Sequence, residues 1–189
     1  MNYQIVVAGI GGQGTLFATR IFTEIARLRH LPVIGSENHG MSQRGGSVVS
    51  HLKLGTFHSP LVSHGQADLL LGIDPVEAHR NLPFVGHGPG ALCVVNASEG
   101  RRFPHPDMAG LLEARGVEVL TCPADALALE AGSALAANLV LLGLATTDRR
   151  FPFGYEEVRE AVQGVSAAPY AQVNLDALAR GRGWATRQG

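Results

Sequence analysis

The fold is decided by residues 3–28, which read YQIVVAGIGGQGTLFATRIFTEIARL. Residues 3–8 form a short apolar run of the kind found in buried strands, and residues 15–29 carry apolar side chains at helical spacing. A glycine-rich segment with the pattern GxGxxG, residues 9–14, lies between them. A strand, a glycine turn and a helix in this order predict the first unit of an α/β sheet.

Further along the chain, short apolar runs alternate with helical patterns, which favours a largely parallel sheet. We expect further strands at 32–35, 47–54, 68–73, 91–96 and 117–121. One further helix is expected after Asp74, with Asp74 as its N-cap and Glu77 as an acid in its first turn. Other helices are expected at 107–115, 124–147 with a break at Gly132-Ser133, 155–163 and 175–180, with a frayed tail from Gly181. The predicted fold is therefore α/β, a Rossmann-like, doubly wound, mostly parallel sheet with helices on both faces. No linker marks a boundary, so residues 1–189 are expected to form a single domain.

Charge and composition exclude several classes of partner. Of 189 residues, 15 are Lys or Arg and 16 are Asp or Glu, so the net charge is −1 and no basic patch for nucleic acid is indicated. The first residues lack the basic region of a signal peptide, and the longest apolar stretch, 134–145, is too short to span a membrane. We expect a cytoplasmic protein that binds neither nucleic acid nor membrane.

The glycine-rich segment is the first candidate binding site. Glycines allow a tight turn and close approach of the backbone to a ligand, and the free amides at the start of the helix attract an anion such as a phosphate. The candidate contacts are Gly9, Gly11, Gly12, Gln13, Gly14 and Thr15. For the segment as a whole, the open alternative is a tight turn without a ligand. For Gln13, the open alternative is an amide that ties this loop to the second one instead of facing a ligand.

A second glycine-rich segment, HGMSQRGG at residues 39–46, lies in a stretch (37–46) that we interpret as a loop. Arg44 supplies a planar fork of donors for a phosphate or carboxylate, or it pairs with an acid at a subunit interface. His39, Arg44, Gly45 and Gly46 are the candidate contacts. In a doubly wound sheet both loops leave the carboxyl ends of their strands, so they should outline one polar crevice.

A stand-alone nicotinamide-dependent Rossmann dehydrogenase is the main alternative. Its ribose-binding acid would be Glu37, which lies 23 residues after Gly14. The segment after Glu37 is a second glycine loop rather than a helix, which weakens this interpretation. We assign no catalytic residue and no metal ligand, because the histidines lack metal-binding spacing and the two cysteines, Cys93 and Cys122, stand alone in apolar strands.

The motifs resemble one known family. The segments GIGGQG (9–14), ENHGMSQRGGSVVSHLKLG (37–55) and SPLVSHGQADLLLGIDPVEAHR (59–80), with the helical stretch 138–144 and Asn174, resemble the gamma-type subunits of 2-oxoacid (pyruvate or indolepyruvate) ferredoxin oxidoreductases. The resemblance covers nearly the whole chain. Within that family, HGMSQRGGSVVSH is most similar to the beta subunits of the indolepyruvate branch, whose substrates are arylpyruvates.

The resemblance implies an accessory subunit that is inactive alone. The complete enzyme would oxidise a 2-oxo acid to acyl-CoA and CO₂ and reduce ferredoxin. A large partner subunit would carry thiamine diphosphate, Mg²⁺ and the iron–sulfur clusters, since a four-iron cluster needs about four cysteines. This chain would contribute coenzyme A contacts through its two glycine loops, or act as a non-catalytic docking module. A homodimer is an alternative assembly of the isolated chain.

Overall fold

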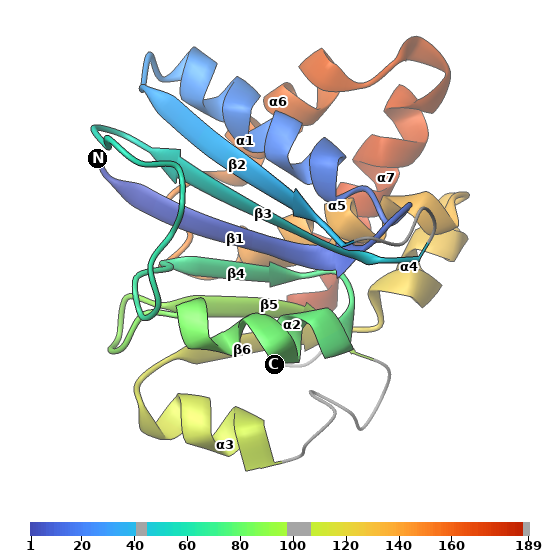
Figure 1. The fold of residues 1–189 in the computed structure, drawn as a ribbon. Coiled ribbons are helices and arrows are strands. Elements are labelled where there is room, and N and C mark those ends of the chain that lie inside the picture. Colours follow the sequence, from blue (N-terminus) through green and yellow to red (C-terminus); the bar gives the residue numbers. More distant parts are fainter. Residues whose placement is uncertain (41–44, 98–106, 187–189) are drawn as a thin grey trace.

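A six-stranded sheet forms the centre of the part of the chain that the computed structural model describes, residues 1–40, 45–97 and 107–186 (Figure 1). Its strands are β1 Tyr3–Ile10, β2 Val33–His39, β3 Ser47–Leu54, β4 Leu69–Gly72, β5 Leu92–Asn96 and β6 Glu118–Cys122. The strand order is β2-β3-β1-β4-β5-β6. Strand β3 is antiparallel to both of its neighbours, and β1, β4, β5 and β6 pair in parallel. The expected mostly parallel sheet is therefore confirmed.

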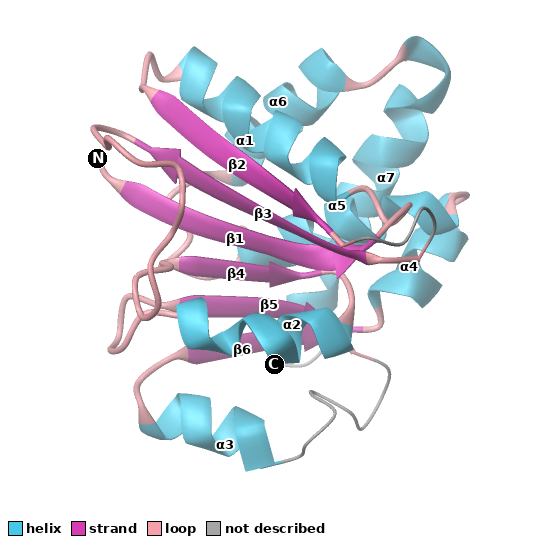
Figure 2. Cartoon of the chain, viewed as in Figure 1, coloured by secondary structure: helices cyan, strands magenta, loops and turns pink. Residues whose placement is uncertain are grey.

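Helices cover both faces of the sheet (Figure 2). One face carries α1 Thr15–Leu28, α4 Ala124–Ala131, α5 Ala137–Ala145, α6 Tyr155–Val165 and α7 Ala171–Ala185. The other face carries α2 Pro75–Asn81 and α3 Asp107–Ala114. Short 3₁₀ turns lie at η1 Leu82–Phe84, η2 Ala134–Ala136 and η3 Ala168–Tyr170. This arrangement confirms the doubly wound architecture.

Strand β1 lies between two apolar cores. Its side chains alternate, so that Ile5 and Val7 pack toward α1 and α5, while Val6 and Ala8 pack toward α2. All four are fully buried. Burial on both faces explains why the sequence of this strand is a continuous apolar run rather than an alternating one.

Local signals in the sequence correctly located several helix ends. The Asp74 carboxylate accepts hydrogen bonds from the amides of Val76 and Glu77, both at 2.9 Å, and so caps α2 as expected. The break between α4 and α5 also occurs where it was predicted. Gly132 adopts φ +106°, a left-handed conformation that suits glycine at the end of a helix.

Strand β2 is longer than expected. Glu37, Asn38 and His39, interpreted above as the start of a loop, continue the strand. In the antiparallel ladder with β3, Glu37 pairs with Ser50 and Asn38 with Val49. Pairing with β3 therefore overrides the weak strand propensity of these polar residues, as tertiary context often does.

The expectation of a frayed tail from Gly181 is wrong. Helix α7 begins before the predicted range and continues to Ala185, because it crosses α5 at very close distance. Glycines make this approach possible: a Cβ atom built on Gly181 would lie 1.8 Å from the carbonyl oxygen of Val140, and one on Gly143 would lie 2.0 Å from that of Leu178. Glycine at these two positions therefore allows the backbones of α5 and α7 to touch.

A buried histidine on β3 makes the stability of the fold depend on pH. The His51 side chain is 4% exposed, and its Nδ1 accepts a hydrogen bond from the Val62 amide at 3.3 Å. Burial, with a smaller contribution from the charge of Lys53, holds the pKa of His51 below its usual 6.5. When the pH falls below about 6.5, the unfolded chain takes up a proton at this site that the folded chain does not, so folding stability is lost as the pH decreases.

We expect the free energy of unfolding to drop more between pH 7.5 and pH 5 in the wild type than in His51→Gln, whose amide cannot titrate. Urea denaturation at both pH values measures this difference. His58→Gln is the matched control, because His58 is exposed. An equal loss in the wild type and His51→Gln would contradict the assignment.

Candidate functional site

The two glycine-rich loops meet at one edge of the sheet. Strands β1 and β2 are both antiparallel to β3, so they run in the same direction and their carboxyl ends share that edge. The amide of Gly11 in the first loop donates a hydrogen bond to the carbonyl of Gly46 in the second, at 2.9 Å. At the base of the second loop, the Gly40 amide donates to the Ser47 carbonyl at 2.7 Å. The backbone itself joins the two segments.

The first loop turns through two left-handed glycines. Gly12 has φ +99° and Gly14 has φ +79°, a region that other residues seldom adopt. The Gln13 Oε1 accepts a hydrogen bond from the amide of Ile10 at 2.9 Å. Gln13 therefore folds back onto the end of its own strand, and the hydrogen bond that ties the two loops together is made by backbone atoms.

Helix α1 starts at this turn, and its start is held by Asn138, 124 residues further along the chain than Gly14. The Gly14 carbonyl accepts hydrogen bonds from the amides of Phe17 and Ala18 and from the Asn138 Nδ2 at 2.8 Å. Asn138, at the start of α5, is 1% exposed. This contact fixes the start of α1 against α5, with the free amides of its first turn at the glycine loop.

A cavity of about 550 Å³ lies around the first loop. Its lining residues are Gly11, Gly12, Gly14, Thr15, Leu16, Phe17, Arg20 and Val48. The partial positive charge at the start of α1, about half an elementary charge, and the guanidinium of Arg20 both make it attractive to anions. We call it the loop cavity.

Arg20 is the functional candidate that sequence reasoning missed. Its side chain is exposed, and among the described residues it makes no ion pair and no hydrogen bond. It lines three neighbouring hollows on both sides of α1. The signal was a lone arginine within the first turns of the helix that follows the glycine loop, on a helix whose other early residues are apolar or hydroxyl-bearing.

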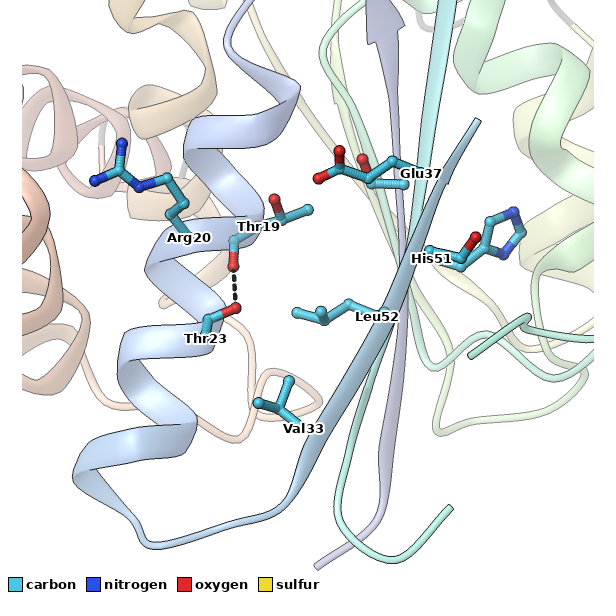
Figure 3. A pocket seen from close by; sticks show the side chains of 10 residues that line it. Thr19, Arg20, Thr23, Val33, Glu37, His51 and Leu52 are labelled. Carbon is cyan, nitrogen blue, oxygen red and sulfur yellow. Dashed lines mark hydrogen bonds between the residues drawn. The ribbon is translucent and has the colours of Figure 1, made fainter. Parts of the chain in front are cut away.

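Glu37 belongs to a different hollow from the first glycine loop. It lines a groove of about 490 Å³ between α1 and the edge strand β2, opposite Thr19 and Thr23 of the helix (Figure 3). In a dinucleotide-binding fold the strand that bears the ribose-binding acid lies next to β1. Here β3 separates β2 from β1, so the geometry does not support the nicotinamide interpretation.

The remaining predicted contacts belong to the second loop. Gly45 has φ +74° and Gly46 provides the carbonyl that binds Gly11. Of His39 only the backbone is described, as the last residue of β2, and Arg44 lies outside the described residues. Thr15 is 3% exposed, and its hydroxyl oxygen lies close to Gly9.

A buried carboxylate anchors the end of the second loop. The Ser47 hydroxyl donates to Glu77 Oε2 at 2.7 Å, and Arg80 pairs with Glu77 Oε1 at 2.6 Å. Glu77 is only 4% exposed. The sequence identified Glu77 solely as an acid in the first turn of α2, but it also fixes the start of β3 to that helix.

The two cysteines are buried thiols. Cys93 and Cys122 are free, and burial raises the pKa of each to about 12, so both remain protonated and unreactive at neutral pH. Within residues 1–40, 45–97 and 107–186, no three His, Cys, Asp or Glu side chains are grouped so that they could hold a metal ion. None of the helices described in that part of the chain is long and apolar enough to cross a membrane.

Comparison with known proteins shows that the family described as pyruvate ferredoxin/flavodoxin oxidoreductase matches residues 4–184. A protein of Methanothermobacter thermautotrophicus named indolepyruvate oxidoreductase subunit IorB is 35% identical, over 97% of this chain and 97% of that protein. A protein of the same name from Archaeoglobus fulgidus is 34% identical, over 96% of this chain and 94% of its own length.

Solved structures share the fold. The gamma subunit of a keto/oxoacid ferredoxin oxidoreductase from Geobacter sulfurreducens superposes with a TM-score of 0.75 at 21% identity, over 98% of this chain and 99% of that one. A 2-oxoglutarate:ferredoxin oxidoreductase from Magnetococcus marinus, solved with 2-oxoglutarate, coenzyme A and succinyl-CoA, superposes with a TM-score of 0.71 at 22% identity. The match covers 98% of this chain and 31% of that longer one.

Proposed function

The chain belongs to the pyruvate ferredoxin/flavodoxin oxidoreductase family, and from that membership we propose that it is the accessory, gamma-type subunit of an indolepyruvate:ferredoxin oxidoreductase. The observation that carries the proposal is the likeness, along nearly the full length of both chains, to relatives named indolepyruvate oxidoreductase subunit IorB. In this proposal residues 1–189 act as one gamma-type domain, and the complex converts an arylpyruvate to acyl-CoA and CO₂ while it reduces ferredoxin.

The redox cofactors of such an enzyme do not fit this chain. An iron–sulfur cluster needs about four thiolate ligands, whereas Cys93 and Cys122 are protonated and buried on neighbouring strands. We therefore assign thiamine diphosphate, Mg²⁺ and the clusters to a large partner subunit, through which electrons reach ferredoxin. Two free thiols are also compatible with the cytoplasm, a reducing compartment, as the location of the complex.

Coenzyme A is the ligand that suits the loop cavity. It is an anionic thiol that accepts the acyl group, and a structural neighbour was solved with it. The free amides at the start of α1 and the Arg20 guanidinium would hold its phosphates, with Gly11, Gly12 and Gly14 allowing close approach. Gly9 and Gln13 shape the turn, and His39, Arg44, Gly45 and Gly46 are proposed contacts from the second loop. Thr15 is retained as a contact at the margin of the loop cavity, whereas Glu37 lines the neighbouring groove, which shares Arg20 with this site.

The test of the proposed function is reconstitution from separate subunits. We expect the purified chain to show no 2-oxo-acid-dependent reduction of a viologen dye, because it lacks cluster ligands. Mixed with the large subunit, it should give reduction that requires coenzyme A and an arylpyruvate. Anaerobic spectrophotometry measures the rate with each subunit alone and with both. If the large subunit alone reaches the same coenzyme A-dependent rate, the proposed function is wrong.

A further inference from the structure

A second cavity lies on the other side of α1 from the Glu37 groove. It is enclosed by the first turns of α1, by η2 and the start of α5, and by the connection between α6 and α7. Its volume is about 610 Å³, within the range of small-molecule sites. The lining residues are Gly12, Gly14, Phe17, Arg20, Ser133, Leu135, Asn138, Val165, Ser166, Ala167, Tyr170 and Asn174. We call it the α1–α7 cavity.

The walls of this cavity present uncovered apolar surface. Tyr170 is 63% exposed and Leu135 is 70% exposed, and Phe17 of α1 also lines the cavity. A tyrosine ring offers a flat face to another planar ring, and such contacts contribute beyond the area that they bury. The walls therefore suit a ligand with a flat aromatic group.

One of the lining residues, Asn138, carries a buried acceptor that no group of the described chain satisfies. Asn138 donates its amide to the Gly14 carbonyl, but its Oδ1 is buried and has no hydrogen-bond partner. Leaving a buried acceptor unpaired costs about 1 to 3 kcal/mol, so a ligand that brings an N–H to this point recovers a contact that folding leaves unmade. Two further lining residues, Asn174 and Ser166, are joined by a hydrogen bond from the Asn174 Nδ2 to the Ser166 hydroxyl at 2.8 Å.

The α1–α7 cavity also has a cationic side chain in its lining. Arg20 lines the cavity, and Figure 3 shows its side chain extending from α1 on the side away from Glu37. Among the described residues no carboxylate pairs with it. Its planar guanidinium can bind a phosphate or carboxylate through two parallel hydrogen bonds. Arg20 also lines the loop cavity, so the two cavities share this cation.

We propose that the α1–α7 cavity binds a flat heteroaromatic anion. The ring lies against Tyr170, the anionic group pairs with Arg20, and a ring N–H or amino group donates to the Asn138 Oδ1. Two molecules of the proposed reaction have this chemistry: the adenine nucleotide end of coenzyme A, and an arylpyruvate such as indolepyruvate. Only the choice of these two sources rests on the proposed function.

Titration calorimetry on the full chain tests the site with four probes. Adenosine 3′,5′-bisphosphate and indole-3-pyruvate each combine a ring with an anion, while pyrophosphate and pyruvate carry the anion alone. We expect at least one ringed probe to bind at least about tenfold more tightly than its ring-free counterpart. The tighter of the two ringed probes identifies the source. Binding by neither ringed probe, or equal binding by the ring-free anions, overturns the proposal.

Two variants with matched controls locate the binding. Tyr170→Ala and Arg20→Gln should each lower the affinity for the ringed probe roughly tenfold. Both residues are exposed, so the fold should tolerate the changes. The controls remove an exposed large hydrophobic side chain and an exposed arginine away from the cavity: Leu129→Ala, 64% exposed on α4, and Arg149→Gln, exposed beyond the end of α5, should leave affinity unchanged. Undiminished affinity in both test variants places the ligand elsewhere and overturns the proposal.

Calorimetry tests the cavity proposal independently of the proposed function. Calorimetry needs no partner subunit and no turnover, so binding in the cavity can be measured whether or not reconstitution succeeds. If reconstitution gives partner-dependent activity while the ringed probes fail to bind, the cavity proposal fails and the proposed function stands. If the ringed probes bind but the large subunit alone reaches the full coenzyme A-dependent rate, the proposed function fails and the cavity proposal stands.

Discussion

Gly181→Ala is expected to destabilise the chain more than any other single methyl substitution discussed for this protein. The added Cβ would lie 1.8 Å from the Val140 carbonyl oxygen, a backbone atom that cannot rotate away, so α7 and α5 would have to separate. Overpacking costs about 1 to 3 kcal/mol and occasionally more, and a clash with a backbone oxygen belongs at the upper end, which outweighs the gain of up to about 1 kcal/mol from replacing a helical glycine by alanine. Urea denaturation measures the loss.

The same helix provides a control for Gly181→Ala. Gly183 lies two residues further along α7, and a Cβ atom built there meets nothing within 4 Å. Gly183→Ala should therefore stabilise the chain, by up to about 1 kcal/mol. If Gly181→Ala also stabilises the chain, helix propensity rather than the α5–α7 contact governs both positions, and the crossing is less tight than described.

Gly14→Ala is expected to have the second-largest effect, on both stability and coenzyme A-dependent activity. Gly14 has φ +79°, which costs another residue about 1 to 2 kcal/mol, and the new Cβ would lie 2.4 Å from the Asn138 Nδ2. The methyl group would thus displace the amide that holds the Gly14 carbonyl and the start of α1. We expect a loss of roughly 2 to 3 kcal/mol in the free energy of unfolding.

Activity in the reconstituted complex should fall with Gly14→Ala through a higher KM for coenzyme A, because the anion-binding amides are displaced. Gly11→Ala serves as the comparison. Its Cβ would be no closer than 3.6 Å to the Gly45 amide nitrogen, an ordinary contact, so folding stability should stay unchanged. An unchanged KM in Gly14→Ala, measured with complex that is fully folded, would remove the start of α1 from the coenzyme A site.

Much of the fold was predictable because its signals are local. The strand–glycine–helix unit at residues 3–28 and the capping Asp74 each depend on neighbouring residues, and both occur as expected. The motifs around the two glycine loops predicted the family, which the comparisons confirm. The approach of the two loops followed from strand direction alone.

The features that sequence reasoning missed depend on contacts distant in the chain. The continuation of β2 through Glu37 is set by pairing with β3, and the extent of α7 by the glycines of the crossing with α5. Arg20 was not distinguished from other exposed arginines, because its importance comes from the three hollows that meet beside it. Asn138 donates to the carbonyl of Gly14, 124 residues away, and both this contact and its unpaired oxygen are visible only in three dimensions.

The hydrogen bond between the Gly11 amide and the Gly46 carbonyl has an evolutionary consequence. Every amino acid has a carbonyl and every one except proline has an amide, so this joint between the loops places almost no demand on side-chain identity. Side chains on the loops are then free to diverge while the loops keep their mutual position. Descendants of one ancestral domain could in this way change the molecule or subunit that they recognise without rebuilding the scaffold that presents it.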